Sequence, residues 1–213
     1  TALRYGDLTG ETQFSAPAMD LVDRCWRYGY DGETGRWLHQ VPRLHSENVP
    51  DTPHHRRTPW WVQQYGNYLA LFAYHVTGEA RYLEVFQRAA AFWDAHFVDR
   101  RHGGEFLNVA IQPGGEVTGE KRPESAYHSM EHALLVSLYL DLFVTKQPAT
   151  LHFRVQSPGP GSVYPVFPIE SPEVKLTGVT VQGEPWERFD AGARSVTLPQ
   201  GDDVPLAVTL EGR

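Results

Sequence analysis

The sequence predicts a mainly α-helical domain of helical hairpins, followed by a small antiparallel β-sandwich. Three observations predict this: apolar residues at helical spacing before residue 148, a loop pattern that occurs twice between helices, and short strand-like runs after Pro148. We expect a helical domain over residues 1–148 and a β-domain over residues 149–213. A domain of about 60 residues is marginally stable alone, so we expect the β-domain to pack on the helices.

Helices are expected over residues 16–28, 58–78, 80–97 and 124–144. Ser15 and Thr58 are the expected caps, because each is followed by a proline that suits the first turn. Gly78 is expected to end the second helix. The predicted apolar stripe of the second helix is Trp61, Tyr65, Tyr68, Leu69, Phe72 and Val76, and that of the third is Leu83, Phe86, Ala90, Trp93 and Phe97.

Two loops between helices follow the same pattern. Asp31 and Asp99, 68 residues apart, each precede a glycine four positions later and then an aromatic residue. This spacing fits one long helical hairpin with its loop, so the sequence predicts a repeated supersecondary unit.

After Pro148 the sequence changes to short apolar runs separated by turns. Strands are expected over residues 151–155, 163–167, 174–181, 195–198 and 205–210. Between them lie clusters of Gly, Pro, Ser and Asp, which are typical of turns. No catalytic cluster is evident in this part of the chain.

The composition excludes several classes of protein. A net charge of −7 argues against nucleic-acid binding, which depends on Lys and Arg at phosphates. No apolar run is long enough to span a membrane. The single cysteine, Cys25, excludes an internal disulfide and fits a cytoplasmic location. The chain begins with Thr1 and carries no signal-peptide pattern, so we expect either processing or a fragment.

The most informative motif begins the fourth predicted helix. His128, Glu131 and His132 stand at positions i, i+3 and i+4, so they share one helix face. Groups of this kind are costly to bury without a function or good partners. The order His-x-x-Glu-His also matches an inverted zinc-protease motif, and the same residues suit a proton-transferring histidine.

Several segments together resemble the N-acylglucosamine 2-epimerase superfamily, which includes cellobiose 2-epimerases and aldose–ketose isomerases. The matching segments are Trp60–Gln63, Thr77–Leu83, Phe97–Phe106 and Tyr127-His128, with Lys121 before the last. The resemblance covers about residues 16–143, in the order of the family.

The resemblance implies the C-terminal part of an (α/α)6 barrel that binds a small-molecule sugar. It implies that His128 transfers a proton beside the sugar carbonyl and that Trp61 stacks on the sugar, without metal or other cofactor. Histidine suits this role because it titrates nearest neutral pH. The expected substrate-binding residues are Trp60, Trp61, Gln64, Lys121, Tyr127, Glu131 and His132.

This sequence differs from the pattern of the resembled family in two respects. The family tends to have a glutamate where this chain has Tyr65, which we expect to be a structural residue that continues the apolar stripe. The first catalytic histidine of the family would lie before Thr1. We therefore expect a missing N-terminal half, or a second chain, to complete the barrel.

Three alternatives stay open. The chain could be a sugar-binding or structural relative without turnover, as the Tyr65 substitution suggests. A glycoside hydrolase would need a pair of catalytic carboxylates, and none can be assigned convincingly. A zinc hydrolase would need a third ligand such as Glu211 in addition to the two histidines.

Overall fold

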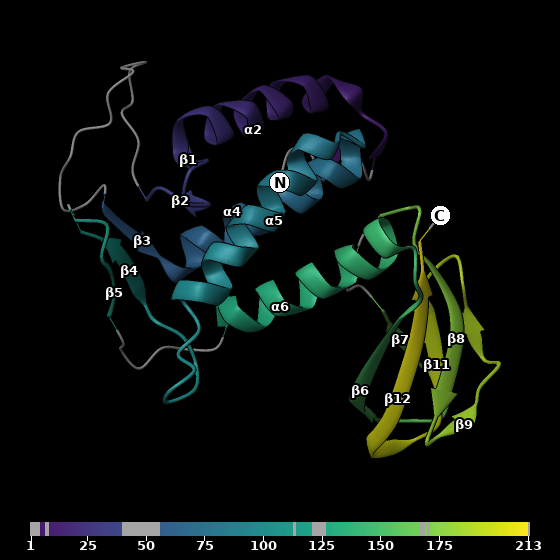
Figure 1. The fold of residues 1–213 in the computed structure, drawn as a ribbon. Helices are drawn as coiled ribbons and strands as arrows, with labels where there is room; N and C mark the ends of the chain where they lie inside the picture. The colour runs from purple at the N-terminus through teal and green to yellow at the C-terminus, as the bar shows by residue number, and fades with distance from the viewer. Residues whose placement is uncertain are drawn as a thin grey trace. The chain divides into compact units, whose positions relative to one another are not determined.

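The computed structural model describes residues 5–6, 9–39, 56–112, 114–120, 127–166, 169 and 171–212 (Figure 1). The chain forms two compact units, one mainly from Glu11–Val136 and the other mainly from Ser137–Arg213. The boundary expected between residues 148 and 149 stays a prediction. None of the described helices is both long and apolar enough to cross a bilayer.

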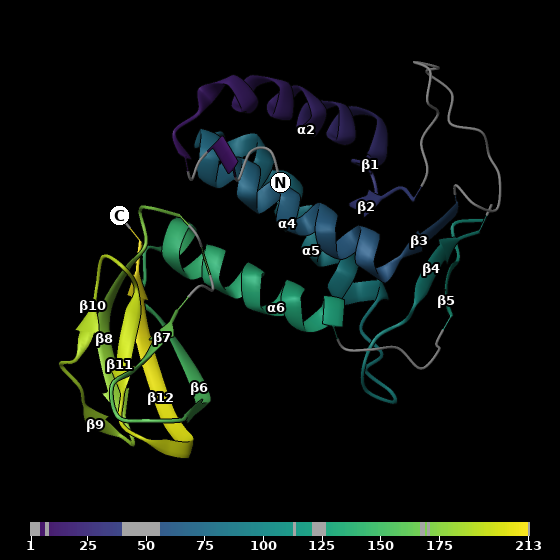
Figure 2. The same cartoon turned by 180° about the vertical axis from the view of Figure 1, so that it is seen from behind.

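The first unit is mainly helical. It holds the short 3-10 turn Thr12–Phe14 and the helices α2 (Ser15–Gly29), α4 (Trp60–Thr77), α5 (Ala80–His96) and the first part of α6 (Tyr127–Tyr139). Helices α4 and α5 pack against each other, and α2 also contacts α4 (Figures 1 and 2). The four predicted helices are therefore present. The ends of α2, α4 and α5 lie within two residues of the predicted ones, and α6 ends at Tyr139, five residues before the predicted end.

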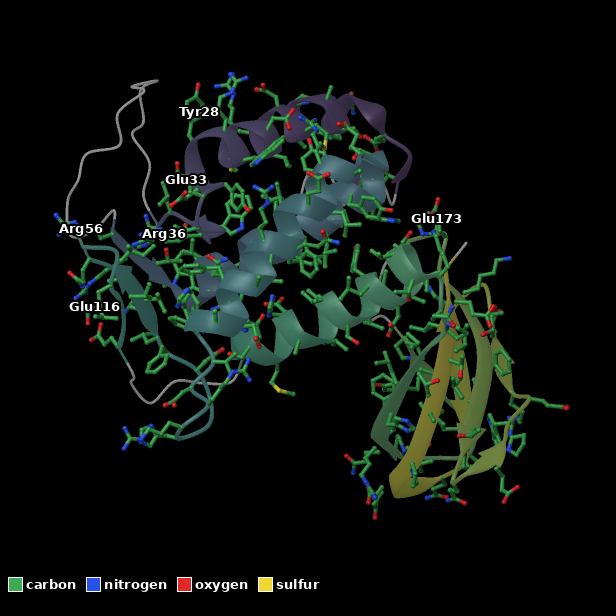
Figure 3. All side chains as sticks on the ribbon, viewed as in Figure 1. Tyr28, Glu33, Arg36, Arg56, Glu116 and Glu173 are labelled. Carbon is green, nitrogen blue, oxygen red and sulfur yellow. The ribbon has the colours of Figure 1, made fainter. Side chains whose placement is uncertain are left out.

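Small antiparallel sheets lie at the ends of these helices. The hairpin of β1 (Tyr30–Asp31) and β2 (Arg36–Trp37) follows α2, and β3 (Arg57–Pro59), β4 (Asn108–Ile111) and β5 (Val117–Glu120) form a second sheet in that order. Arg36 Nη1 donates to the Arg56 carbonyl over 2.8 Å (both residues are labelled in Figure 3). This bond connects β2 to the start of β3.

The predicted helix caps are wrong at two of three positions. Ser15 is inside α2, because the 3-10 turn before it already brings the chain into a helical path. Thr58 belongs to β3, where its hydroxyl donates to the Trp37 carbonyl over 2.7 Å. Gly78 does end α4, in a left-handed conformation with φ 69° that suits glycine.

The predicted buried faces of α4 and α5 are right only in part, since Phe72 and Phe86 are buried as expected but most other residues of the two stripes are not. On α4, Trp61 is 37% exposed and Tyr65 is 42% exposed, whereas the amide side chains Gln63, Gln64 and Asn67 are buried. The buried residues of α5 are Tyr82, Val85, Phe86, Ala89 and Phe92. The apolar stripe misleads because α4 is apolar on several sides, so polar residues with specific partners decide which face is buried.

Gln63 joins three segments of the helical unit. Its Oε1 accepts the backbone N–H of Trp37 at 2.9 Å, and its Nε2 donates to the carbonyls of Gly35 at 2.9 Å and Ala89 at 3.0 Å. The side chain has no solvent exposure. One residue of α4 therefore holds the β1–β2 hairpin against α5.

Gly66, one turn after Gln63, lets the hairpin approach α4 closely. A Cβ atom at this position would lie 2.3 Å from the ring of Trp37. Because no side chain fits there, Trp37 packs directly on the helix backbone and is buried.

The two similar loops have the same hydrogen bonds. In both, the glycine N–H donates to the aspartate carbonyl over 2.8 Å, from Gly35 to Asp31 and from Gly103 to Asp99. In both, an aspartate Oδ1 accepts the N–H two residues later at 3.0 Å.

Both loops are also closed by equivalent backbone bonds, Leu38 N–H to Gly29 O and Phe106 N–H to Phe97 O. Each of these pairs is shifted by the same 68 residues as the aspartates. The predicted repeat of the loops is thus present in the structure.

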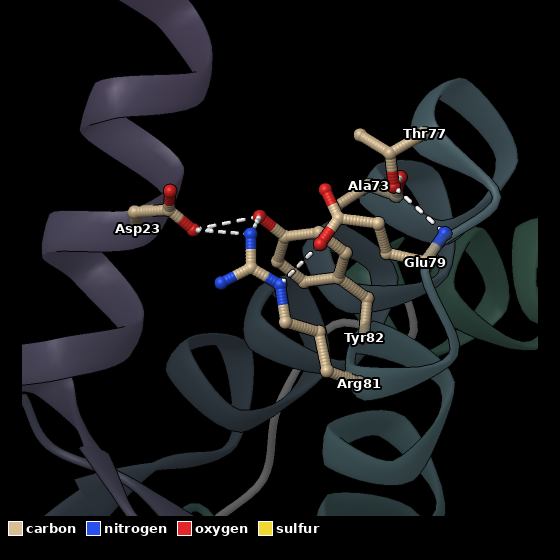
Figure 4. A network of polar contacts seen from close by, with 6 residues as sticks. All are labelled: Asp23, Ala73, Thr77, Glu79, Arg81 and Tyr82. Atoms are coloured by element: carbon tan, nitrogen blue, oxygen red, sulfur yellow. Dashed lines mark hydrogen bonds and ion pairs between the residues drawn. The ribbon is translucent and has the colours of Figure 1, made fainter.

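A polar network attaches α2 to α5 (Figure 4). Tyr82 donates its hydroxyl proton to Asp23 Oδ1 over 2.6 Å, and Arg81 lies 3.4 Å from the same oxygen. The Arg81 guanidinium also lies over the ring of Trp26, 5.1 Å from its centroid. Burial, followed by the hydrogen bond and charge of Asp23, raises the pKa of Tyr82.

The second unit is built from antiparallel sheets. The last helical turns, Leu140–Thr145, have π-helical bonding and end at Lys146 with φ 55°. One sheet has the order β6 (Ala149–Ser157), β12 (Gly201–Glu211), β8 (Lys175–Val181), β9 (Glu184–Pro185), and the other has the order β10 (Phe189–Asp190), β11 (Ser195–Leu198), β7 (Ser162–Pro165). Strands β6, β7, β8, β11 and β12 overlap the five predicted runs, whereas β9 and β10 were not predicted and β12 begins four residues before its predicted run. The description as a sandwich stays a prediction.

Replacing Gln63 by leucine should destabilise the helical unit by about 2–4 kcal/mol, because the Trp37 N–H and two carbonyls lose their buried partner. Urea unfolding followed by circular dichroism measures this change. The control is Gln87→Ala at an exposed position of α5, which should change the stability by less than about 0.5 kcal/mol. A loss below about 1 kcal/mol for Gln63→Leu would contradict the anchoring role.

Tyr82→Phe should lower the stability at pH 7 by about 1 kcal/mol, through loss of the bond to Asp23. Because the pKa of Tyr82 is raised in the folded state, the unfolded chain releases this proton first, from about pH 10 upward. The wild type should therefore lose stability above about pH 10 more steeply than Tyr82→Phe. Thermal unfolding between pH 7 and 11 tests this, with Tyr127→Phe at an exposed position as the control.

Candidate functional site

A small pocket lies between α4 and the first turns of α6, within the helical unit. It is shallow, because its free volume of about 210 Å³ includes open solvent at its mouth and its interior has room for about one water molecule. Its lining is Gln64, Tyr65, Tyr68, His128, Glu131, His132 and Leu135. The helix spacing explains this set, because residues 64, 65 and 68 share one side of α4, and residues 128, 131, 132 and 135 share one side of α6.

His128 lines the pocket and lies among aromatic rings. Its ring centroid is 5.8 Å from that of Trp60, 5.5 Å from that of Tyr65 and 5.0 Å from that of Tyr127, all in edge-to-face contact. The side chain is 31% exposed, so it is held in place and still reachable from solvent.

Tyr65 connects His128 with Glu131. Its hydroxyl lies 3.3 Å from His128 Nδ1 and 3.1 Å from Glu131 Oε2. Glu131 Oε2 is itself 3.9 Å from His128 Nδ1. Burial, followed by the hydrogen bond and charge of Glu131, raises the pKa of Tyr65, so the phenol keeps its proton at neutral pH.

His132 is the more deeply placed histidine of the motif. Its Nε2 lies 3.5 Å from Asn67 Nδ2, and its ring is 5.5 Å from that of Trp93. Burial lowers the pKa of His132 to about 4, so the ring is neutral at physiological pH. A neutral ring bonded to an amide suits a structural or pocket-lining role.

Gln64 and Asn67 bring unused hydrogen-bond acceptors to this region. Gln64 Nε2 donates to Glu105 Oε2 at 3.3 Å and to Ser129 Oγ at 3.4 Å, and Ser129 donates to the other oxygen of Glu105. Gln64 Oε1 and Asn67 Oδ1 are buried and have no donor among the described residues. Buried acceptors of this kind usually have a donor, such as an ordered water molecule.

The structure brings together four of the predicted site residues: Gln64, His128, Glu131 and His132. Trp60 and Tyr127 contact the ring of His128 from outside the pocket. Trp61 is not part of the lining, and its ring contacts that of His39 at 5.8 Å. Lys121 lies outside the described residues. Their roles toward a sugar stay predictions.

Tyr65 does not continue a buried stripe, because it is 42% exposed and its hydroxyl lies between two of the predicted site residues, His128 and Glu131. The expectation that its role is structural stays a prediction. Tyr68, Asn67, Glu105 and Ser129 were also missed. The spacing of residues 60, 64, 67 and 68 could have indicated a second face of α4. Nothing local to the sequence places Glu105 beside that face.

No group of three or more His, Cys, Asp or Glu side chains within the described part of the chain could hold a metal ion. His128 and His132 instead contact aromatic rings and polar side chains.

Residues 44–132 match the family model of N-acylglucosamine 2-epimerase. The resemblance to this superfamily is confirmed for that segment. It includes α4, α5 and the His128–His132 motif, so the pocket described above lies almost entirely within the matched residues. No curated protein matches the chain at a significant level.

Solved structures similar to this chain include sugar-acting enzymes. Cellobiose 2-epimerase from Spirochaeta thermophila is 23% identical over 62% of this chain and 31% of its own, with TM-score 0.43. A D-mannose isomerase is 18% identical over 64% of this chain and 34% of its own, with TM-score 0.49.

An unsaturated glucuronyl hydrolase from Streptococcus agalactiae is 17% identical over 64% of this chain and 35% of its own, with TM-score 0.50. This likeness concerns the fold alone. The chain spans about a third of the length of each of these three structures.

His132 should make the protein sensitive to acid. Between pH 6.5 and about pH 4 the unfolded chain binds a proton at this histidine and the folded chain does not, so stability falls as the pH falls. In His132→Gln, the loss of stability from pH 7 to pH 5 should be smaller by about 1–2 kcal/mol. Urea unfolding at both pH values measures this, and the exposed His152→Gln should behave like wild type.

Proposed function

We propose that the protein is a carbohydrate epimerase or isomerase in which His128 transfers a proton beside a sugar carbonyl. The match of residues 44–132 to the epimerase family model carries this proposal. The geometry supports it, because His128 lies in the matched segment, lines a pocket and stays accessible.

The proposed reaction needs a group that can act as base and then as acid. A neutral imidazole takes the proton from the carbon next to the carbonyl, and the electron pair moves to the carbonyl oxygen as an enolate. Return of a proton to the opposite face of the same carbon gives the epimer. For the isomer, the enolate oxygen takes up the proton that the hydroxyl on the deprotonated carbon gives up, the former carbonyl carbon receives the returned proton, and the oxygen that lost its proton becomes the new carbonyl. Histidine suits both directions because its pKa lies near neutral pH.

The surrounding residues suit a neutral, hydroxyl-rich substrate. The Gln64 amide, the Tyr65 hydroxyl and the Glu131 carboxylate belong to residues that line the pocket, and groups of these kinds can hydrogen-bond to sugar hydroxyls. Trp60 and Tyr127, beside His128, offer flat apolar faces to the C–H groups of a sugar ring. Proton transfer of this kind requires no metal or nucleotide.

Epimerisation also requires a second proton-transferring group on the other side of the sugar. His132 is a poor candidate, because burial holds it neutral with a pKa of about 4. We expect the second group from a part of the fold outside the described residues, or from another chain. The cytoplasmic location suggested by the single cysteine likewise stays a prediction.

The experiment is incubation of the protein with mannose, cellobiose or N-acetylglucosamine in deuterated water. Deuterium should enter at the carbon beside the carbonyl of a substrate, and NMR or mass spectrometry detects it. His128→Ala should lower the exchange rate by roughly 10²- to 10⁴-fold, which is typical of loss of a general acid/base. His152→Ala, at an exposed position of the second unit, is the control and should keep the wild-type rate.

Equal exchange by wild type and His128→Ala would contradict the assignment of His128. Binding of several sugars without any exchange would identify a sugar-binding relative without turnover. Cleavage of a glycosidic bond would identify a hydrolase instead.

A further inference from the structure

We propose that Tyr65 is a positioning residue that couples the Glu131 carboxylate to His128 and holds the neutral imidazole in the tautomer with the proton on Nδ1. The catalytic meaning of this arrangement rests on the proposed function, whereas the tautomer can be measured without any substrate.

The hydrogen bonds of Tyr65 determine which ring nitrogen of His128 carries the proton. A phenol hydroxyl has one proton to donate and lone pairs with which to accept. Glu131 Oε2 is a charged acceptor at 3.1 Å, closer than His128 Nδ1 at 3.3 Å. Hydrogen bonds to charged groups are the stronger ones, so the proton points to Glu131. The Tyr65 oxygen then remains as an acceptor, and His128 Nδ1 must be the donor.

Tyr65 cannot act by losing its proton at neutral pH. Burial and the neighbouring Glu131 charge both raise its pKa. The hydroxyl therefore stays neutral and bonded, which suits a relay that orients a ring.

Glu131 alone cannot hold the proton on His128 Nδ1, because it does not hydrogen-bond to that nitrogen directly. Its Oε2 is 3.9 Å from His128 Nδ1, which is too long for a hydrogen bond. The path through the hydroxyl consists of two shorter contacts, 3.1 Å and 3.3 Å. Tyr65 thus spans a gap between two residues of α6 that stand three positions apart.

The consequence concerns the other ring nitrogen. With the proton on Nδ1, Nε2 of a neutral His128 has a free lone pair and can act as the base. In the opposite tautomer Nε2 carries a proton and cannot accept one. The relay therefore determines which imidazole nitrogen is available for proton abstraction, in the way that an orienting group fixes the tautomer of a catalytic histidine.

The direct test is long-range ¹H–¹⁵N NMR of the full chain labelled with ¹⁵N-histidine. The His128 signals are assigned by their loss in His128→Ala, and spectra are recorded where this ring is neutral. Wild type should show mainly the Nδ1–H form. Tyr65→Phe should move His128 mainly to the Nε2–H form. Glu131→Ala should do the same, because the freed hydroxyl proton can then be donated to Nδ1.

Tyr127→Phe is the matched control. This change also removes a hydroxyl from a ring that contacts His128, but no hydrogen bond joins that hydroxyl to the imidazole among the described residues. The tautomer should stay as in wild type. A wild-type protein with Nε2–H, or a Tyr65→Phe variant with an unchanged tautomer, would overturn the proposal.

Kinetics separate this inference from the proposed function. If exchange occurs, Tyr65→Phe should lower kcat by roughly tenfold or more with KM changed less than about twofold, because orientation of the base matters in the chemical step. If no sugar exchanges its proton for deuterium but His128 shows the expected tautomers in wild type and variants, the proposed function is wrong and the relay through Tyr65 is supported. If exchange depends on His128 but the tautomer of His128 is the same in wild type and Tyr65→Phe, the relay through Tyr65 is wrong and the proposed function is not affected.

Discussion

The buried amide of Gln63 is the constraint on which the helical unit depends. Its three hydrogen bonds join α4 to the β1–β2 hairpin and to α5, and a buried amide of this kind cannot be left without partners at low cost. These bonds also fix the rotation of α4 about its axis. Once Gln63 faces inward, Gln64 and Asn67 are buried beside it, and Tyr65 is turned toward α6.

The site follows from this rotation. Both partners of His128 in the relay come from regular helices, so their positions depend on helix packing and not on loop conformation. The sequence raised the concern that a carboxylate is lost where Tyr65 replaces the glutamate usual in the resembled family. The structure places Glu131 next to the Tyr65 hydroxyl, so a carboxylate is present near His128 but comes from α6.

Local sequence patterns predicted the positions of the helices and strands well, but predicted less well which side of a helix is buried. Helix positions, the Gly78 terminus and most strands follow from spacing, glycine and proline, which act over a few residues. The face of α4 does not, because Trp61 and Tyr65 are as apolar as the core residues, while Gln63 is buried only thanks to partners 26 and 28 residues away. The grouping of His128, Glu131 and His132 was predictable from one helix, but the role of Tyr65 depends on a contact 63 residues away.

The repeated loops have one more consequence. The shift of 68 residues that aligns Asp31 with Asp99 also aligns Gln63 with Glu131. The two side chains have nearly the same shape and differ in that one is a neutral amide and the other an acid. In the first copy of the unit the amide of Gln63 hydrogen-bonds to three backbone groups and holds their segments together. In the second copy the acid, Glu131, lines the pocket. Of the two corresponding positions, one is therefore needed to hold the fold together and the other is available for a functional group.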